Sequence, residues 1–313
     1  MVDNPTDARA SEKERNRWLL RRAMWLSVGA GFFMLGIKIA GYVLTGSTAI
    51  LSDAAESVVH VVAVCFAAYS LRLSAKPADA GHLYGHAKIS FFSAGFEGAM
   101  IIIAALYIIY TAVLKWLRGL ELEHLGLGTL LTVLATLING ALGAYLVLLG
   151  RRKKSLILEA NGRHVLTDCY TSLGVIVGLL LVLWTGWKPW DPICAIVVAA
   201  NILLSGTRLI MTSVSGLMDV ADPEVHKKII EILDRETRRH GITYHDLLHR
   251  NLGDAQRVAV HLLFPGDTPI RQAHHIATQI EDEIEAAFDP PASVTTHLES
   301  VDDHAAAHER RPH

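Results

Sequence analysis

Six long apolar runs occupy most of this chain before residue 213. Each approaches the roughly 20 residues that an α-helix needs to cross the hydrocarbon core of a bilayer. The runs are continuous and lack the alternating apolar and polar pattern of a membrane β-barrel, so we predict helices. The predicted spans cover residues 24–44, 48–71, 90–114, 127–149, 164–185 and 190–212.

Composition supports a membrane as the solvent of this part of the chain. Of 313 residues, 51% are hydrophobic and 19% are charged, which is more apolar than a soluble globular protein usually is. The formal net charge of -2 argues against a basic surface, so nucleic acid is not an expected partner. The cysteines form no CxxC pair and are expected to be small buried packing residues: Cys65, Cys169 and Cys194.

The short connections between the spans predict the orientation. The N-terminal arm, the turn after the second span and the run from Arg151 to Lys154 carry most of the positive charge and lie on one side. The positive-inside rule therefore places both termini in the cytoplasm. The run at 24–44 has no cleavage site of a signal peptide and should be retained. We expect an integral protein of the lipid bilayer, in the (inner) cell membrane.

The composition changes abruptly after the last span, and residues 213–300 are predicted to form a cytoplasmic α+β domain. Pro223 and Pro269 each follow a capping residue at a helix start, and Gly241 ends the first of these helices. The predicted order is helix, strand, strand, helix, strand, with β-branched strands at 242–251, 256–264 and 293–299. The remaining segments are a cytoplasmic arm at 1–23, the transmembrane domain at 24–212 and a disordered tail at 301–313.

Charged side chains within the spans are the first functional candidates, since each costs about 2.5 to 3.5 kcal/mol at a helix centre. Glu56 and His60 are four residues apart in the second span, and His164 and Asp168 are four apart in the fifth. This spacing places each pair on one helical face. Two facing helices would then supply four donors without a thiolate, a set that suits a tetrahedral divalent metal ion, with zinc fitting best.

Other roles remain open for these polar residues. His60 and His164 could be hydrogen-bonding partners of the acids at a helix interface, although two matched pairs would then be needed independently. Asp53, on the same stripe as Glu56, could orient a ligand, carry protons or cap the helix. Lys38 in the first span could pair with an acid such as Asp53, extend its amine toward the membrane surface or be buried against protein.

Two further groups of metal-binding residue types lie outside the spans. The turn after the second span holds Asp79, His82 and His86, which could bind a metal or be ordinary solvated loop residues. In the soluble domain, His297 and Glu299 share a strand face by the strand period of two. These domain residues form a metal site only if they converge in space: His245, His261, His274 with its neighbour His275, His297 and Glu299. His249, His304, His308 and His313 are weaker candidates.

With these motifs the chain resembles the cation diffusion facilitators, which are zinc and proton exchangers. The family has six transmembrane helices and a cytoplasmic metallochaperone-like, ferredoxin-like α+β domain, and the resemblance covers nearly the whole chain. It is carried by Thr45-Gly46-Ser47, Asp53-Ala54-Ala55-Glu56-Ser57, His60, Pro77-Ala78-Asp79 through Tyr84-Gly85-His86, His164 and Asp168.

The resemblance implies three metal sites and a homodimer. The transport site is Glu56, His60, His164 and Asp168, and the loop site is Asp79, His82 and His86. A binuclear site that joins the cytoplasmic domains of two protomers is His245, His261, His274, His297 and Glu299. Lys88 and Asp219 match a charge pair between protomers. In zinc members of the family the second-span pair is usually His or Asp followed four residues later by Asp. The Glu56 and His60 pair departs from this pattern, which leaves Fe(II), Co(II), Cd(II) and Mn(II) in competition with zinc.

The predicted function is export of a divalent metal ion, Zn2+ first, by alternating access with protons as counter-ion. A ligating imidazole must be neutral and a ligating carboxylate ionised, so protons and metal compete for the same lone pairs. The cytoplasmic domain would act as a metal sensor that regulates transport. One rival is a membrane-anchored metal sensor that does not transport. The other, an intramembrane metalloenzyme, is disfavoured because Glu56 to His60 lacks the HExxH order, and we expect no enzyme.

Overall fold

The computed structural model describes residues 5–45, 48–118 and 127–302. The chain divides into two compact units, Met1–Val214 and Ser215–His313. Among the described residues, the first unit consists of helices α1 to α6, and the second contains α7, α8 and a three-stranded sheet. The helices of the first unit therefore correspond to the six apolar runs of the sequence.

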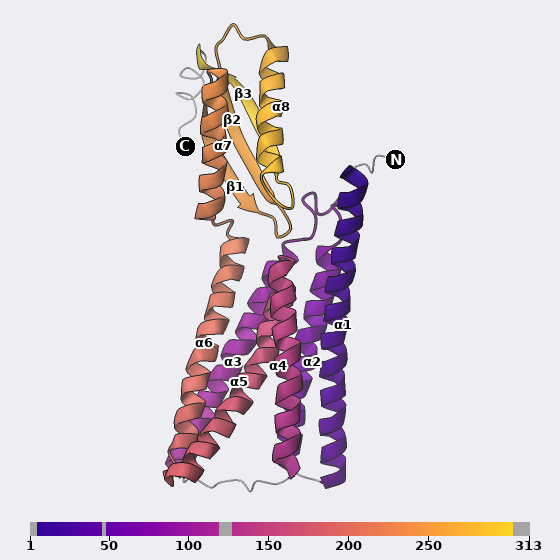
Figure 1. Ribbon diagram of the computed structural model, residues 1–313, viewed down its shortest axis with the longest axis vertical. Coiled ribbons are helices and arrows are strands. Elements are labelled where there is room, and N and C mark those ends of the chain that lie inside the picture. The colour runs from indigo at the N-terminus through magenta and orange to yellow at the C-terminus, as the bar shows by residue number, and fades with distance from the viewer. Residues whose placement is uncertain (1–4, 46–47, 119–126, 303–313) are drawn as a thin grey trace. The chain divides into compact units, whose positions relative to one another are not determined.

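The helices of the first unit run side by side along its length (Figure 1). Within the described residues, two stretches are long and apolar enough to cross a membrane, Ile89–Leu114 in α3 and Trp190–Leu217 in α6. Six membrane spans therefore stay a prediction. The helices are α1 Pro5–Thr45, α2 Thr48–Ser74, α3 Ile89–Arg118, α4 Leu127–Arg152, α5 Leu156–Thr185 and α6 Trp190–Leu217.

Two helices begin well before the apolar run that predicted them. The polar N-terminal arm is helical from Pro5 and continuous with the first run. Helix α5 begins at Leu156 because Ser155 caps it, its side-chain oxygen accepting from the backbone N–H of Leu158 at 3.4 Å. It ends at Gly186, whose φ of 71° favours glycine. Hydropathy locates the apolar part of a helix, whereas capping decides where its hydrogen bonds begin and end.

Small residues bring α3 and α6 into backbone contact. A Cβ atom added to Gly98 would lie 3.0 Å from the carbonyl oxygen of Gly206, and one added to Gly206 would lie 3.0 Å from that of Gly98. Such close approach is how helices associate in lipid, where excluding water supplies no driving force. Buried side chains on both helices continue the contact: Ala94, Ile101, Ala105, Ile202 and Leu209.

The cysteine prediction is wrong for one residue. Cys65 is exposed on α2, while Cys169 and Cys194 are half-buried. A small side chain on the surface of a membrane helix can face lipid, where an apolar group has nothing to gain from burial in protein.

The second unit follows the predicted order of helix, strand, strand, helix, strand. Strand β2 pairs antiparallel with β1 and parallel with β3, so α8 forms the crossover between two parallel strands. This is the ferredoxin-like β-α-β-β-α-β order without its first strand. The elements are α7 Pro223–His240, β1 Thr243–Asn251, β2 Gln256–Phe264, α8 Ile270–Ala286 and β3 Ser293–Ser300.

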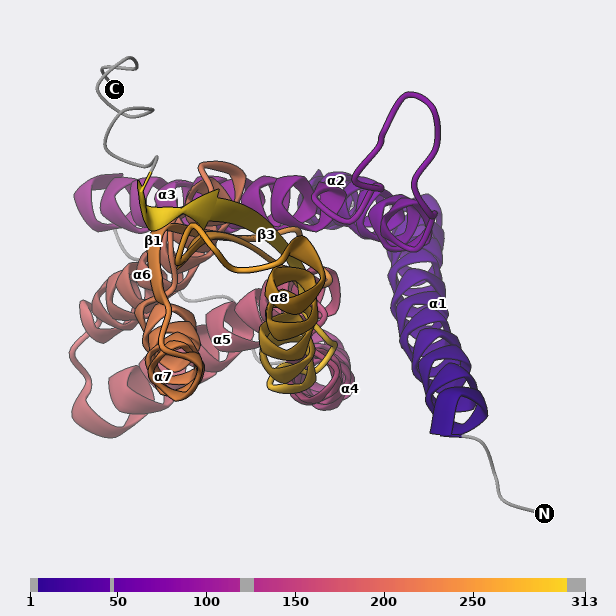
Figure 2. The same cartoon turned by 90° about the horizontal axis from the view of Figure 1, so that it is seen from above.

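Both helices of the second unit cover the same face of its sheet (Figure 2). Val258, Val260 and Leu262 of β2 are buried in the core that also contains Ile229 of α7 and Ile280 of α8. Successive residues of a strand point to opposite faces. The intervening residues of β2, including the one at position 261, therefore belong to the face that the helices leave uncovered.

Candidate metal sites

His60 of α2 meets His164 and Asp168 of α5 inside the first unit. The Nδ1 atom of His60 lies 3.6 Å from Oδ2 of Asp168, and the ring centroids of the two histidines are 4.7 Å apart. The spacing of four residues on α5 directs both of its side chains toward α2. The structure therefore brings together three of the four residues that were predicted to form an intramembrane site.

The fourth predicted residue falls on an undescribed part of the structure. Glu56 stands one helical turn before His60 in α2, but its side chain lies outside the described residues. The same is true of the side chains of Asp53 and Lys38. Their roles stay predictions.

Glu97 of α3 belongs to the same group, although residue spacing did not indicate it. Its side chain is fully buried, and its Oε2 lies 3.1 Å from Nδ1 of His164. Within the described chain, neither oxygen of this carboxylate has a hydrogen-bond partner of suitable geometry, and neither have the Nδ1 atoms of His60 and His164. The sequence did contain an indication of Glu97, because an ionisable residue inside an apolar span is a functional candidate even without a partner four residues away.

Unpartnered buried polar atoms of this kind destabilise a protein unless something binds them. Each costs about 1 to 3 kcal/mol, and more if the group is charged. Here the atoms are imidazole nitrogens and carboxylate oxygens facing one another across three helices, so a proton or a metal cation would satisfy them. Imidazole and carboxylate donors without a thiolate suit divalent ions of the first transition row.

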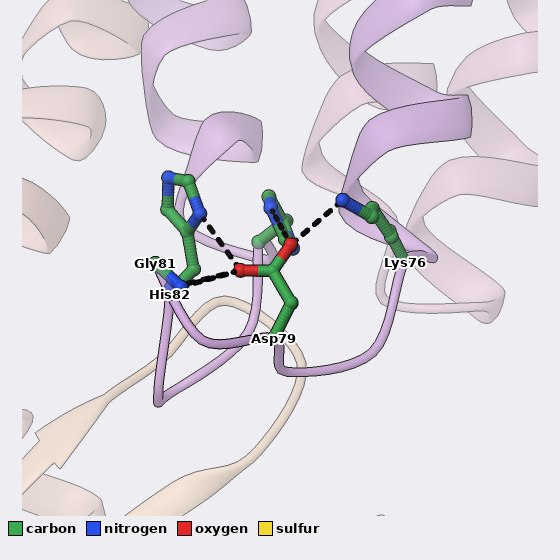
Figure 3. Close-up of polar contacts among 5 residues, drawn as sticks. Lys76, Asp79, Gly81 and His82 are labelled. Atoms are coloured by element: carbon green, nitrogen blue, oxygen red, sulfur yellow. Dashed lines mark hydrogen bonds and ion pairs between the residues drawn. The ribbon is translucent and has the colours of Figure 1, made fainter.

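The turn between α2 and α3 forms a second cluster (Figure 3). Nδ1 of His82 lies 3.2 Å from Oδ1 of Asp79, and Nε2 of His86 lies 3.5 Å from Oδ2. The rings of the two histidines are 4.2 Å apart, centroid to centroid. The three predicted loop residues are thus close enough to bind a single ion.

Local hydrogen bonds hold the loop carboxylate in place. Oδ1 of Asp79 accepts from the backbone N–H groups of Gly81 and His82, at 3.1 and 2.9 Å (Figure 3). Lys76 donates from Nζ to Oδ2 at 2.7 Å, and this hydrogen bond holds the pKa of Asp79 well below its usual range. A metal ion bound here would compete with the lysine for the same oxygen.

The third cluster lies on the uncovered face of the sheet. His261 of β2 is paired in register with His245 of β1 and with His297 of β3, so the three histidines stand side by side. Glu299 reaches all three: its oxygens lie 3.0 Å from Nε2 of His245, 3.0 Å from Nδ1 of His261 and 3.5 Å from Nε2 of His297. Four of the five predicted domain residues therefore converge.

The fifth residue, His274, is exposed on α8, and no contact joins it to this cluster among the described residues. Asp246 takes a place beside the cluster that the sequence did not predict, with Oδ2 4.0 Å from Nδ1 of His245. With His245 and His261 it could hold a metal ion. An irregular register between His245 and Leu248 and a φ of 48° at Asp246 accompany this placement.

The weaker histidine candidates have other positions. His249 of β1 stacks on His226 of α7, with ring centroids 5.2 Å apart. The tail histidines at positions 304, 308 and 313 lie outside the described residues.

Two family models match nearly the whole chain. A model described as "Cation efflux transmembrane domain" matches residues 24–218, and one described as "Cation efflux protein, cytoplasmic domain" matches residues 221–301. The chain belongs to the cation diffusion facilitator family. It is accordingly a membrane protein of a cation efflux family, a family of transporters rather than of enzymes.

Curated relatives of this cation diffusion facilitator align with most of its length. An uncharacterized transporter of Synechocystis sp. is 37% identical over 278 residues, which cover 89% of each chain. The cation-efflux pump FieF of Salmonella paratyphi A is 29% identical over 280 residues, covering 89% of this chain and 92% of that one. A solved structure of CzrB in its zinc form is 29% identical, covers 27% of this chain and 94% of its own, and gives a TM-score of 0.26.

Proposed function

We propose that this protein exports a divalent metal ion, Zn2+ first, in exchange for protons. The observation that carries the proposal is the convergence of His60, His164 and Asp168 between α2 and α5. Together with Glu56 they would provide two imidazoles and two carboxylates, a donor set that suits tetrahedral zinc. The relative FieF, whose name is that of a cation-efflux pump, supports the direction of transport.

Competition between protons and metal at these ligands would couple the two fluxes. Metal entering from the cytoplasm would displace protons, because a bound imidazole must be neutral and a bound carboxylate ionised. Protons arriving when the site opens to the other side would then release the metal. An inward proton gradient would thus drive metal outward by alternating access.

Donor chemistry supports zinc without excluding its neighbours. Fe(II), Mn(II), Co(II) and Cd(II) can bind the same nitrogen and oxygen donors, since geometry and availability rather than affinity separate these ions in cells. A protein of this family that transports one of them instead of zinc is the second candidate.

The cytoplasmic domain would bind metal, regulate transport and join two protomers into a homodimer. The group around Glu299 would bind regulatory metal, with His274 contributed by a second copy of the chain because it stands apart from the group within one chain. Both termini would lie in the cytoplasm and the protein in the (inner) cell membrane. Asp219, expected to pair with Lys88 of a second copy, has an intrachain partner in Arg250 at 3.7 Å.

Flux measurements on the purified protein in vesicles test the proposal. Uptake of Zn(II), Fe(II), Mn(II), Co(II) and Cd(II) is measured separately, with and without an imposed pH gradient. The proteins compared are the native chain, Asp168→Ala and the neighbouring control Cys169→Ala. We expect gradient-dependent zinc flux in the native chain and the control, and background flux in Asp168→Ala. Flux that neither moves protons nor responds to the gradient would overturn antiport. No flux of any metal would favour a metal sensor.

A further inference from the structure

Glu97 is a buried carboxylate beside the group of His60, His164 and Asp168. The proposed function gives Glu97 no role. We propose that Glu97 is a direct ligand of the transported metal, so that the site spans α2, α3 and α5 and can also bind ions that accept more than four donors. This inference rests on the proposed function, since it concerns the same site. Three observations on Glu97 support it: its distance to His164, its unsatisfied oxygens and the packing of its helix.

The distance to His164 fits two ligands of one ion. Two donor atoms that each lie about 2.0 to 2.1 Å from a tetrahedral ion are about 3.3 Å apart. Oε2 of Glu97 and Nδ1 of His164 are 3.1 Å apart, yet their geometry is not that of a hydrogen bond. The two atoms are therefore spaced as neighbouring ligands.

The buried oxygens of Glu97 have no hydrogen-bond partner of suitable geometry among the described residues, so a metal cation could bind them in place of a proton. The side chain is fully buried, and among the described residues no lysine or arginine forms an ion pair with it. Asp168 is close enough to interact with it electrostatically, which adds a second negative group to the same space. A divalent ion between these carboxylates would satisfy both oxygens and remove the repulsion.

The packing of α3 holds Glu97 in position. The adjacent residue Gly98 is in contact with the backbone of α6 at Gly206, which leaves little freedom for the helix to shift. A ligand on a tightly packed helix is preorganised, as a metal site requires. Neighbouring Ser93, one turn earlier on α3, is equally buried and provides a matched comparison.

A ligand at Glu97 changes which metals the site should favour. With Glu56, the site would offer two imidazoles and three carboxylates, one donor more than tetrahedral zinc uses. Oxygen-rich sites with more than four donors suit Mn(II), Fe(II) and Co(II). Glu97 would therefore widen the range of transported ions beyond zinc.

Cobalt binding tests this proposal separately from transport, because the visible spectrum of Co(II) depends on its ligands. The full-length protein carries Asp79→Ala to disable the loop site and both Glu299→Gln and His261→Ala to disable the cytoplasmic site. Three forms of this protein are titrated with Co(II): one with the native Glu97, one with Glu97→Gln and one with Glu97→His. Loss of a residue that only orients a ligand weakens metal binding about 10- to 100-fold, so we expect Glu97→Gln, which removes a ligand, to weaken binding by more than this and to change the spectrum. Glu97→His, which keeps a donor, should retain binding with an altered spectrum, and the control Ser93→Ala should match the native site.

An unchanged affinity and spectrum in Glu97→Gln would overturn the proposal, as would an equal loss in Ser93→Ala, which would indicate a general effect of polar groups on α3. If Glu97→Gln does not fold, Glu97→His decides alone, and a native spectrum in that variant also overturns the proposal. Flux assays separate the two claims. Gradient-driven flux with an unchanged cobalt spectrum rejects only the role of Glu97, and cobalt binding without any flux rejects only the transport function.

Discussion

Nδ1 of His60 on α2 lies 3.6 Å from Oδ2 of Asp168 on α5. The two residues are far apart in the chain, and their contact joins the two helices on which histidine and carboxylate pairs recur at a spacing of four. Any change of donor at one of them therefore acts on the other. The composition of the site can be altered from either helix.

His60→Asp should shift metal preference from zinc toward manganese. The substitution replaces a borderline nitrogen donor with a hard oxygen donor beside Asp168, and Mn(II) favours carboxylate ligands more than zinc does. We expect the ratio of Mn(II) to zinc flux in vesicles to rise. Val62→Ala, an exposed position on the same helix, should leave the ratio unchanged. A His60→Asp variant with the native ratio would place His60 outside the site.

Lys76→Met should strengthen metal binding at the loop. Lys76 occupies Oδ2 of Asp79 at 2.7 Å and repels an incoming cation. Exposed ion pairs contribute about 0 to 1 kcal/mol, so affinity should rise up to about fivefold. Metal titration of a chain carrying Asp168→Ala and Glu299→Gln would isolate this site, with Lys153→Met on another turn as control. Weaker binding in Lys76→Met would show that the lysine holds the carboxylate in its binding position.

Glu299→Gln should reduce metal binding by the cytoplasmic domain more than any other single change there. The carboxylate is the common partner of His245, His261 and His297. Because loss of a residue that only orients a ligand already costs about 10- to 100-fold, we expect affinity to fall by at least this much, measured by titration of a chain without the other two sites. His274→Ala should leave binding by the monomer unchanged and weaken only metal-dependent dimerisation, measured by light scattering. If His274→Ala weakened metal binding by the monomer as much as Glu299→Gln does, His274 would belong to the cluster within one chain.

The cytoplasmic domain should lose stability on mild acidification. Burial and the nearby His226 lower the pKa of His249 from its ordinary 6.5, against an opposing effect of Asp222. The unfolded chain therefore binds more protons than the folded one once the pH falls below about 6.5, so stability is full above that pH and declines below it. His249→Gln should flatten this decline, whereas His275→Gln at an exposed position should not. The measurement is hydrogen exchange of the backbone amides of β1 and α7 as a function of pH, corrected for intrinsic exchange rates.

Gly98→Ala should destabilise the membrane unit. The added Cβ would lie 2.9 Å from Cγ1 of Ile210 and 3.0 Å from the carbonyl oxygen of Gly206, so α3 and α6 would have to separate. Overpacking of this kind costs about 1 to 3 kcal/mol. Thermal unfolding in detergent should show a lower midpoint than for Gly29→Ala, where nothing lies within 4 Å of the new atom. Equal midpoints would show that the two helices separate without cost.

Several features of this protein were predictable from local chemistry. The start of α7 at Pro223 follows from its capping residue Asp222, and strand positions such as 256–264 follow from β-branched runs. The cap predicted at Thr268 is wrong, because α8 begins at Ile270 after Pro269, without a capping hydrogen bond from a side chain. The spacing of two residues between His297 and Glu299 likewise predicted that both lie on one face of a strand. Helix starts in the membrane unit were less predictable, because polar turns such as those from Pro5 onward are helical and continuous with an apolar run, and hydropathy marks only where the apolar part begins.

Contacts between elements were the part that local chemistry could not supply. Glu97 is a lone acid on α3, and only the packing of α3 against α5 places it 3.1 Å from His164. Asp246 lies beside His245 where the strand register is irregular, and the residue types in β1 do not predict this irregularity. His274 is a histidine like those of the domain cluster, but it lies elsewhere in the domain. It belongs to α8, whereas the cluster lies on the face of the sheet that the helices do not cover.

The amino-acid sequence by itself determined the apolar helices, the αββαβ domain and the histidine and carboxylate pairs at a spacing of four, because periodicity and capping act within one or two turns of chain. Only the tertiary structure decided which pairs meet and which further groups join them. Metal ligands must come within a few ångströms of one ion, and in this protein α2, α3 and α5 reach that distance through helix packing, which depends on side chains that are distant in the chain.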